Sequence, residues 1–332
     1  MDLDIAFMTN TLGQIPALAR HAEALGLGAV WTSETQHDPF LPLALVSEHT
    51  QRLRFGTAVA IGFARSPMTL AHTAWDLAEH SGGRFMLGLG TQVKPHIERR
   101  FGMAWPESPV NKLREMILAL RAIWTTWQTG AKLNVRGEYF KLTLMTPFFN
   151  PGPIHHPQIP IYIAGVNTGL ARLCGEVCDG FHVHPFHTVS YLRDVLRPAL
   201  AEGAAKTGRA AGQTAVAVSV FTYASAAERE AARAQIAFYA STPSYRPVLE
   251  HHGWGGIGEQ LSALAAQGGW GEMPKLVSDA MLDEIAVAGP LAELAGPLRA
   301  RYAGLADRLT LYRPFSPGAE DAAWQTLAQG LA

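Results

Sequence analysis

The chain has 332 residues, of which 48% are hydrophobic and 17% charged, and its formal net charge is −1 at pH 7. This composition is that of an ordinary folded globular chain, and it excludes extensive disorder and coiled-coil or collagen-like architectures. A charge near zero without any Lys/Arg-rich run excludes the electrostatic footprint of a nucleic-acid-binding or membrane-surface protein, so we expect a small molecule as the partner.

The cysteine content and the first residues indicate the cellular compartment that we expect for the protein. Cys174 and Cys178 are too few for a disulfide scaffold or a cysteine-based metal site, and we expect both to be packed helix thiols. The first residues lack the basic and apolar parts of a signal peptide, and no apolar run reaches about 18 residues. We therefore expect no membrane segment and a cytoplasmic protein.

Short apolar runs alternate with amphipathic segments along the chain. In α/β proteins such runs are buried parallel strands, and the segments between them are crossover helices. The predicted strands are 5–8, 28–32, 53–61, 85–89, 161–164, 180–184, 214–223 and 308–312. The predicted helices are 14–25, 42–50, 67–80, 111–127, 168–177, 189–207, 226–239, 258–267, 273–280 and 290–302.

Two stretches interrupt the alternation. Residues 133–140 are typical of a hairpin, and the prolines of residues 147–160 disfavour helix, so we expect an insertion after the fourth strand. Residues 241–258 form a second irregular segment, after the helix that follows the seventh strand.

Eight strands alternating with helices predict a (β/α)8 TIM barrel, which we expect to form a single domain over residues 1–332. A doubly wound sheet is the alternative, but it needs fewer units. The chain also lacks the Gly-x-Gly-x-x-Gly fingerprint after an early strand and the P-loop motif that would support such a sheet. In a barrel the active site lies at the C-terminal ends of the strands.

The segments that follow the strands therefore meet at one rim. They are Thr9 and Asn10, then residues 34–40, 58–65, 91–96, 165–169 and 184–187. His37, His96 and His184 come from three of them, where a neutral imidazole could either exchange protons with a substrate or only line the pocket. Dispersed histidines are a weak metal signal, so no metal site is predicted.

Two polar features at this rim have both a functional and a structural interpretation. Residues 165–169 lead into a helix with Asn167 or Thr168 as a plausible N-cap, where backbone N–H groups could hold a phosphate or the residues could only cap the helix. Glu34 could accept hydrogen bonds from a ring nitrogen or hold a neighbouring side chain, or it could cap its loop.

Several segments together resemble the luciferase-like monooxygenase superfamily. Residues 83–91, Gly-Arg-Phe-Met-Leu-Gly-Leu-Gly-Thr, followed by Glu-Arg-Arg-Phe-Gly at 98–102, carry the resemblance. The pattern 53–59 with Arg65 and Pro67 is similar to the family's third strand, and 161–165 through 178–181 to its fifth and sixth. The similarity extends over residues 3–315. The family includes flavin-dependent monooxygenases and oxidoreductases that use the deazaflavin coenzyme F-420.

The resemblance implies a tricyclic ring lying across the mouth of the barrel. A bulge at Ala58–Val59, which carries a non-prolyl cis peptide bond in relatives, would back the ring, and the phosphate would lie beside the strand-five turn. The residues expected to bind the cofactor are Glu34, Ala58, Val59, Thr91, Gln92, Gly165, Val166, Asn167, Gly169 and Leu170.

Proton-transfer residues depart from the family pattern. Glu34 matches an acidic position near the ring, but Thr35 stands where a catalytic histidine often follows, and His37 could substitute for it. Gln92 follows the fourth-strand Gly-Thr pair in place of an acid, with His96 nearby. The candidate catalytic residues are thus Glu34, His37 and His96.

The substrate side is expected opposite the third strand. The resemblance places His184 and His187 toward the substrate. Tyr239, Tyr245 and Trp254 flank the second irregular segment and could shape an apolar substrate cleft.

Hydride transfer between F-420 and a small organic substrate is the first hypothesis for function. The alternative is a monooxygenase that uses reduced flavin mononucleotide (FMN) on the same fold. A barrel that binds without turnover and an unrelated barrel hydrolase are further possibilities. The family also suggests a homodimer through the early helices.

Overall fold

The computed structural model describes residues 1–8 and 11–332, so Thr9 and Asn10 lie outside the described residues. Its parallel strands close into a ring, because each pairs with the next and the last pairs with the first. In ring order these strands are β1 (Asp2–Phe7), β2 (Ala29–Thr32), β3 (Arg54–Thr57), β5 (Phe85–Gly90), β8 (Ile161–Gly165), β9 (Gly180–Val183), β10 (Ala215–Tyr223) and β12 (Arg308–Leu311). The predicted (β/α)8 TIM barrel is confirmed and the open sheet is excluded, whereas the single domain stays a prediction.

The third predicted strand is interrupted in the middle. β3 pairs with the start of β5, and β4 (Ala60–Ile61) pairs with its end, at Leu89 and Gly90. The Ala58–Val59 peptide bond between β3 and β4 is cis. A Cβ on Gly90 would lie 2.5 Å from Cγ2 of Val59, so glycine is needed at this position for the two segments to approach. The strand therefore carries its bulge at the C-terminal rim.

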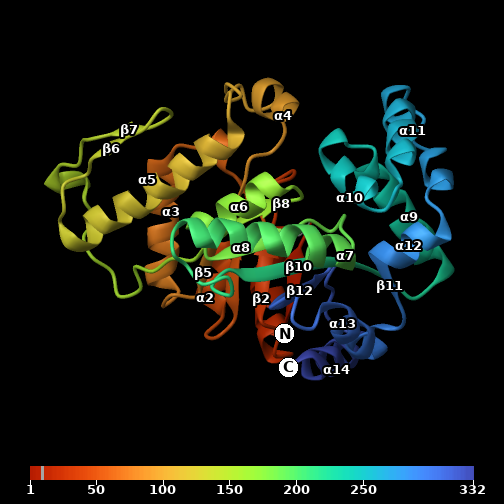
Figure 1. The fold of residues 1–332 in the computed structure, drawn as a ribbon. Helices are drawn as coiled ribbons and strands as arrows, with labels where there is room; N and C mark the ends of the chain where they lie inside the picture. The colour runs from red at the N-terminus through yellow and green to blue at the C-terminus, as the bar shows by residue number, and fades with distance from the viewer. Residues whose placement is uncertain (9–10) are drawn as a thin grey trace.

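Helices surround the barrel (Figure 1). Those of the βα units are α1 (Ile15–Ala24), α2 (Leu41–His49), α3 (Pro67–His80), α5 (Pro109–Thr129), α6 (Thr168–Val177), α8 (Arg197–Lys206), α9 (Ala226–Ala240), α13 (Ala295–Tyr302) and α14 (Asp321–Leu331). Among the described residues, none of the helices is both long and apolar enough to span a bilayer. Cys174 and Cys178 are buried free thiols, as predicted.

The long helix α5 shows how the sequence specifies these elements. The Ser108 hydroxyl caps it by accepting the Asn111 N–H, and Gly130 ends it in the left-handed conformation, at φ 73°. Its buried residues recur with the helical period from Leu113 to Trp127 and face the barrel. Figure 1 shows that α5 leads outward to the hairpin of β6 (Val135–Arg136) and β7 (Lys141–Leu142), which confirms the first insertion.

Several elements differ from the sequence predictions. Residues 241–258 are not irregular, because they contain a 3-10 turn and two helices, α10 (Arg246–His251) and the start of α11 (Gly255–Ala266). The single helix predicted at 273–280 is a 3-10 turn followed by α12 (Asp279–Ile285), which begins at the N-cap Ser278. A short helix after β5, α4 (Lys94–Arg99), and the terminal α14 were not predicted.

The segment from 189 to 206 begins with α7 (Val189–Tyr191), passes through a π-helical turn and ends in α8. One short strand, β11 (Ala286–Ala288), is additional to the eight of the barrel. It pairs with the end of β10, at Phe221–Tyr223. Its three residues are too few to show an apolar run in the sequence.

The N-terminal end of the barrel is filled by a buried ion pair. Asp4, which is 0% exposed, accepts hydrogen bonds from Nε and Nη2 of Arg308, both at 2.7 Å, and from Nε1 of Trp31 at 2.8 Å. These contacts link β1, β2 and β12. The rings of Tyr162 and His182 pack against Trp31. In a barrel of this kind, a ligand site is expected at the opposite, C-terminal end of the strands.

Candidate active site

A charged clamp, which we define as Glu34, Asp38 and Arg65, holds the bulge at the rim. Oε2 of Glu34 accepts the backbone N–H of Ile61 at 2.7 Å and a hydrogen bond from Nη1 of Arg65. Nη2 of the same arginine lies 3.2 Å from Oδ2 of Asp38, and its guanidinium packs over the ring of Phe40. The Glu34 side chain is only 8% exposed, so its carboxylate is committed to these partners.

The loop that carries Glu34 and Asp38 is hydrogen-bonded to the backbone on both sides of the cis peptide bond. The Glu34 N–H donates to the Val59 carbonyl at 3.3 Å, and the Ala58 N–H donates to the Thr32 carbonyl at 2.7 Å. The loop after β2 and the bulge are therefore held to one another by both backbone and side-chain bonds. This arrangement makes Glu34 a group that positions the bulge.

The end of β5 adds a second constrained turn to the rim. Gln92 has a φ of 58°, the only positive φ among the described non-glycine residues. Its Oε1 accepts the N–H of Val93 at 2.9 Å, and the Thr91 hydroxyl donates to the Gln92 carbonyl at 3.0 Å. The α4 segment that follows is tied to the loop after β2, since Arg100 donates to the Thr35 carbonyl.

The two other predicted catalytic residues lie on these loops. His37 and His96 are both exposed, one between β2 and α2 and the other on α4. No described side chain forms a hydrogen bond to either ring. The structure therefore brings Glu34 to the bulge but leaves the two imidazoles in contact with solvent.

The turn between β8 and α6 has the features expected of an anion site. Oδ1 of Asn167 caps α6 by accepting the Leu170 N–H at 3.3 Å, which identifies Asn167 as the N-cap. The first backbone N–H groups of the helix, at Thr168 and Gly169, have no partner within the helix. The Val166 carbonyl accepts the Tyr191 hydroxyl at 2.9 Å, so the turn is fixed from its other side.

The two histidines after β9 have different environments. His187 is 1% exposed; its Nδ1 lies 2.9 Å from the His184 carbonyl and its Nε2 lies 3.1 Å from the Tyr302 hydroxyl. Both of its ring nitrogens are therefore used inside the protein, and none remains for a substrate. Burial lowers the pKa of His187 to about 4.

His184 keeps one nitrogen available. Its Nδ1 accepts the Phe186 N–H at 3.1 Å, which fixes the neutral tautomer with hydrogen on Nε2. Nε2 has no partner among residues 1–8 and 11–332. Burial lowers the pKa of this ring to about 3, so the group is a neutral donor at neutral pH.

Aromatic rings surround His184. The ring of Tyr239 lies 4.6 Å from it, edge to face, and that of Tyr245 lies 4.4 Å from it. Tyr312, at the end of β12, lies 4.7 Å from Phe221 on β10. We call His184, Phe221, Tyr239, Tyr245 and Tyr312 the aromatic box.

The two tyrosines of the box that come from α9 and β12 share one hydrogen bond. The Tyr239 and Tyr312 oxygens are 2.7 Å apart. Burial, and then the neighbouring Tyr312, raise the pKa of Tyr239. Either oxygen can be the donor, so one hydroxyl hydrogen of the pair remains for another acceptor.

Trp254 lies beside the box rather than in it. Its ring stacks on His252 at 4.3 Å and an interplanar angle of 13°. His252 in turn lies 2.8 Å, at Nε2, from the Thr188 hydroxyl. His252, on which Trp254 stacks, therefore joins the α10–α11 segment to the start of α7.

The clamp and the aromatic box lie on opposite sides of the barrel. β3 and β10 are four strands apart in either direction around the eight-stranded ring. The bulge thus faces the strands that carry the box. A planar molecule at the rim would have a charged, clamped wall on one side and a neutral aromatic wall on the other.

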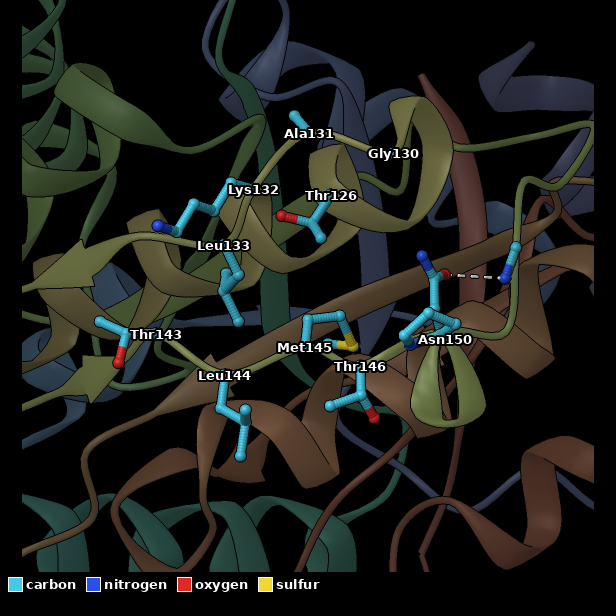
Figure 2. A pocket seen from close by; sticks show the side chains of 12 residues that line it. Thr126, Gly130, Ala131, Lys132, Leu133, Thr143, Leu144, Met145, Thr146 and Asn150 are labelled. Atoms are coloured by element: carbon cyan, nitrogen blue, oxygen red, sulfur yellow. Dashed lines mark hydrogen bonds between the residues drawn. The ribbon is translucent and has the colours of Figure 1, made fainter.

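A separate hollow of 590 Å³ lies away from this rim. Figure 2 shows it between the C-terminal end of α5 and the segment around Thr143 to Asn150. The Asn150 side chain is used locally, since its Oδ1 accepts the Gly152 N–H at 2.9 Å. No predicted site residue lines this hollow.

Among the described residues, no cluster of three or more His, Cys, Asp or Glu side chains is placed to hold a metal ion. The sequence alone assigns no role to Asp38 and Arg65 of the clamp, or to Phe221 and Tyr312 of the aromatic box. Arg65 was visible only as part of the third-strand pattern. Tyr312 follows the last predicted strand, so the rule that site residues follow the strand ends could indicate it.

Comparison with known proteins decides the family. Residues 4–308 match the model of the family described as luciferase-like monooxygenase. The chain belongs to this family. This luciferase-like protein is 47% identical over 310 residues to an uncharacterized protein of Mycobacterium tuberculosis, covering 90% of this chain and 91% of that protein.

Relatives with a stated activity are more distant. The 5,10-methylenetetrahydromethanopterin reductase of Archaeoglobus fulgidus is 29% identical over 283 residues, covering 81% of this chain and 80% of the reductase. The solved coenzyme F-420-dependent tetrahydromethanopterin reductase of Methanopyrus kandleri has a TM-score of 0.79 at 19% identity, covering 99% of this chain and 98% of that structure. At this identity, the structural likeness supports the fold of the luciferase-like protein.

Proposed function

We propose that this luciferase-like protein is an oxidoreductase that transfers a hydride between coenzyme F-420 and a small organic substrate. The observation that carries the proposal is the pairing of two opposed walls at one rim. A cis bulge locked by Glu34 and Arg65 stands opposite a neutral aromatic box. The coenzyme F-420 dependence of the Methanopyrus kandleri reductase supports the choice of cofactor.

The residues at the rim fit such a cofactor. Ala58 and Val59 would hold one face of the ring, and Thr91 and Gln92 lie at the end of the adjacent strand. The free N–H groups of Thr168 and Gly169, beside Gly165 and Val166, suit a phosphate. When bound, the deazaflavin supplies the hydride-accepting or hydride-donating carbon.

The histidines at the rim have two different roles, hydrogen bonding and proton exchange. His184 is neutral at neutral pH and can donate a hydrogen bond without supplying a net proton. His37 and His96 are exposed on rim loops, where an imidazole can exchange protons with water. We assign proton exchange to His37 or His96, and orientation of the substrate to the box. Glu34 acts by positioning the bulge, and His187 by holding the His184 backbone.

Cofactor titration tests the proposal. Quenching of cofactor fluorescence is measured at fixed F-420 or FMN while protein is added. We expect tight binding of F-420 and weak binding of FMN. The reverse order would replace the proposal by a reduced-flavin monooxygenase, and binding of neither would contradict both. The homodimer through the early helices is proposed alongside, and sedimentation of the purified protein checks it.

A further inference from the structure

The short helix α7 lies between the turn that joins β8 to α6 and the α10–α11 segment. Its last residue, Tyr191, is 2% exposed, and the Tyr191 hydroxyl donates to the Val166 carbonyl at 2.9 Å. The Tyr191 ring meets the ring of His251, at the end of α10, at 5.6 Å and an interplanar angle of 74°. Burial, and then Glu250 of α10, raise the pKa of Tyr191 to about 12, so the hydroxyl stays a donor at neutral pH. One buried side chain therefore contacts both the turn and α10.

Two further contacts hold α10 to α7. Nε2 of His252 lies 2.8 Å from the Thr188 hydroxyl, and Nε2 of His251 lies 3.2 Å from the Ser190 hydroxyl. The Thr188 hydroxyl is also the N-cap of α7, since it accepts the Tyr191 N–H at 3.1 Å. In the described part of the chain, no hydrogen bond joins α10 or α11 directly to the turn between β8 and α6. The hydrogen-bonded connection between them therefore runs through α7.

The Tyr191 hydroxyl acts on the N–H groups that the turn presents. A peptide group is planar, so a bond that fixes the Val166 carbonyl also fixes the Asn167 N–H on the other side of the same peptide. Hydrogen bonds in a chain polarise one another, so a carbonyl that accepts a bond makes the N–H of its peptide a stronger donor. An anion held by the N–H groups of Asn167, Thr168 and Gly169 therefore strengthens the bond to Tyr191, and the effect is reciprocal.

We infer that a phosphate bound at the turn between β8 and α6 is coupled through Tyr191 to the α10–α11 segment, which it holds more firmly against the barrel. The inference rests on the proposed function, in which the cofactor supplies the phosphate, and it adds a regulation of that site. Tyr245 directly precedes α10, and its ring packs on His184 at 4.4 Å, so a firmer α10 also steadies the aromatic box. The phosphate of the cofactor thus prepares the opposite wall of the rim, and the cofactor is expected to bind before the substrate.

Hydrogen–deuterium exchange of the backbone amides of residues 246–266, in the full-length protein, tests the coupling. Exchange is compared in the free protein, with F-420, and with a deazaflavin that carries the same ring and ribityl chain but no phosphate. We expect F-420 to slow the exchange about fivefold, and the phosphate-free deazaflavin to slow it less than about twofold. Inorganic phosphate alone should slow it as well.

Tyr191→Phe keeps the ring against His251 and removes only the hydroxyl. This variant should bind F-420 about fivefold more weakly than the unchanged protein, but should bind the phosphate-free deazaflavin equally well. F-420 should no longer slow exchange at residues 246–266. Ser190→Ala tests the other end of the connection, because it removes the contact with His251, and it should also reduce the slowing.

Tyr139→Phe is the matched control, since Tyr139 lies on the hairpin and its oxygen accepts the Ser108 N–H at 3.3 Å. It should show the same slowing as the unchanged protein, and thermal unfolding establishes that each variant is folded. Equal slowing in Tyr191→Phe and the unchanged protein, or equal slowing by F-420 and the phosphate-free deazaflavin, would overturn the inference. Failure of F-420 to bind would instead contradict the proposed function, and exchange with inorganic phosphate alone would then decide on the coupling separately.

Discussion

The two walls of the rim are built from opposite kinds of chemistry. The wall at β2 and β3 is held by charges, with Arg65 between Glu34 and Asp38. The wall at β9, β10 and β12 contains histidines and tyrosines that burial keeps neutral. The comparison teaches that ion pairs here fix a backbone shape, whereas uncharged polar groups are left available to a ligand.

The largest expected effect is the loss of folding stability at low pH. The pKa values of His184 and His187 are lowered to about 3 and about 4, below an unfolded value of 6.5, so between these limits the unfolded chain binds more protons. Stability therefore falls as pH falls from about 6.5 towards 4, by roughly 1.4 kcal/mol per pH unit for each histidine. Urea unfolding at pH 7, 6, 5 and 4.5 measures the loss.

His184→Phe sharpens this prediction because it keeps a ring but removes one titrating group. The variant should lose about 1.4 kcal/mol less per pH unit than the unchanged protein. Parallel pH dependences for the two proteins would show that His184 does not titrate as its burial requires.

Breaking the charged wall is the next largest effect. Glu34→Gln removes the charge opposite Arg65 in a pair whose side chains are 8% and 17% exposed, and we expect unfolding free energy to fall by about 2 kcal/mol. F-420 affinity should fall as well, because the bulge loses its clamp. Asp38→Asn is the matched control: that carboxylate is 41% exposed, so its loss should cost less than about 1 kcal/mol. Equal losses in the two variants would contradict the clamp.

How much of these two walls can be predicted from the sequence depends on how far apart the contacting residues are along the chain. The strands, α5 and the cap at Asn167 follow from local periodicity and short motifs, and the family resemblance located the bulge at Ala58–Val59. The pairing of Tyr239 with Tyr312 joins residues 73 positions apart, which no local pattern encodes. In the same way, no local pattern shows that Nε2 of His187, which was expected to face the substrate, contacts the hydroxyl of Tyr302, 115 positions away.

A smaller loss of stability is expected from a substitution in the turn before α6. Asn167→Leu removes the N-cap of α6, so stability should fall by about 1 kcal/mol and F-420 affinity about tenfold. Ser225→Ala removes the equivalent cap of α9, where Ser225 accepts the Glu228 N–H at 3.2 Å, and should cost a similar stability without changing affinity. Unchanged F-420 affinity in Asn167→Leu would remove the phosphate assignment.

The smallest effect on stability is expected for the exposed rim histidines. His37→Gln and His96→Gln should each change unfolding free energy by less than about 0.5 kcal/mol and leave F-420 affinity unchanged. At least one should lower kcat, because we assign proton exchange to these rings. Full turnover in the double variant would exclude both as proton donors.

A crystal structure of the protein with F-420 bound tests the central claim most directly. We predict that the tricyclic ring lies between the Ala58–Val59 bulge and the aromatic box, with the phosphate within hydrogen-bond distance of the Thr168 and Gly169 N–H groups. A ring bound elsewhere, for instance in the hollow between α5 and the segment at Thr143 to Asn150, would contradict the account.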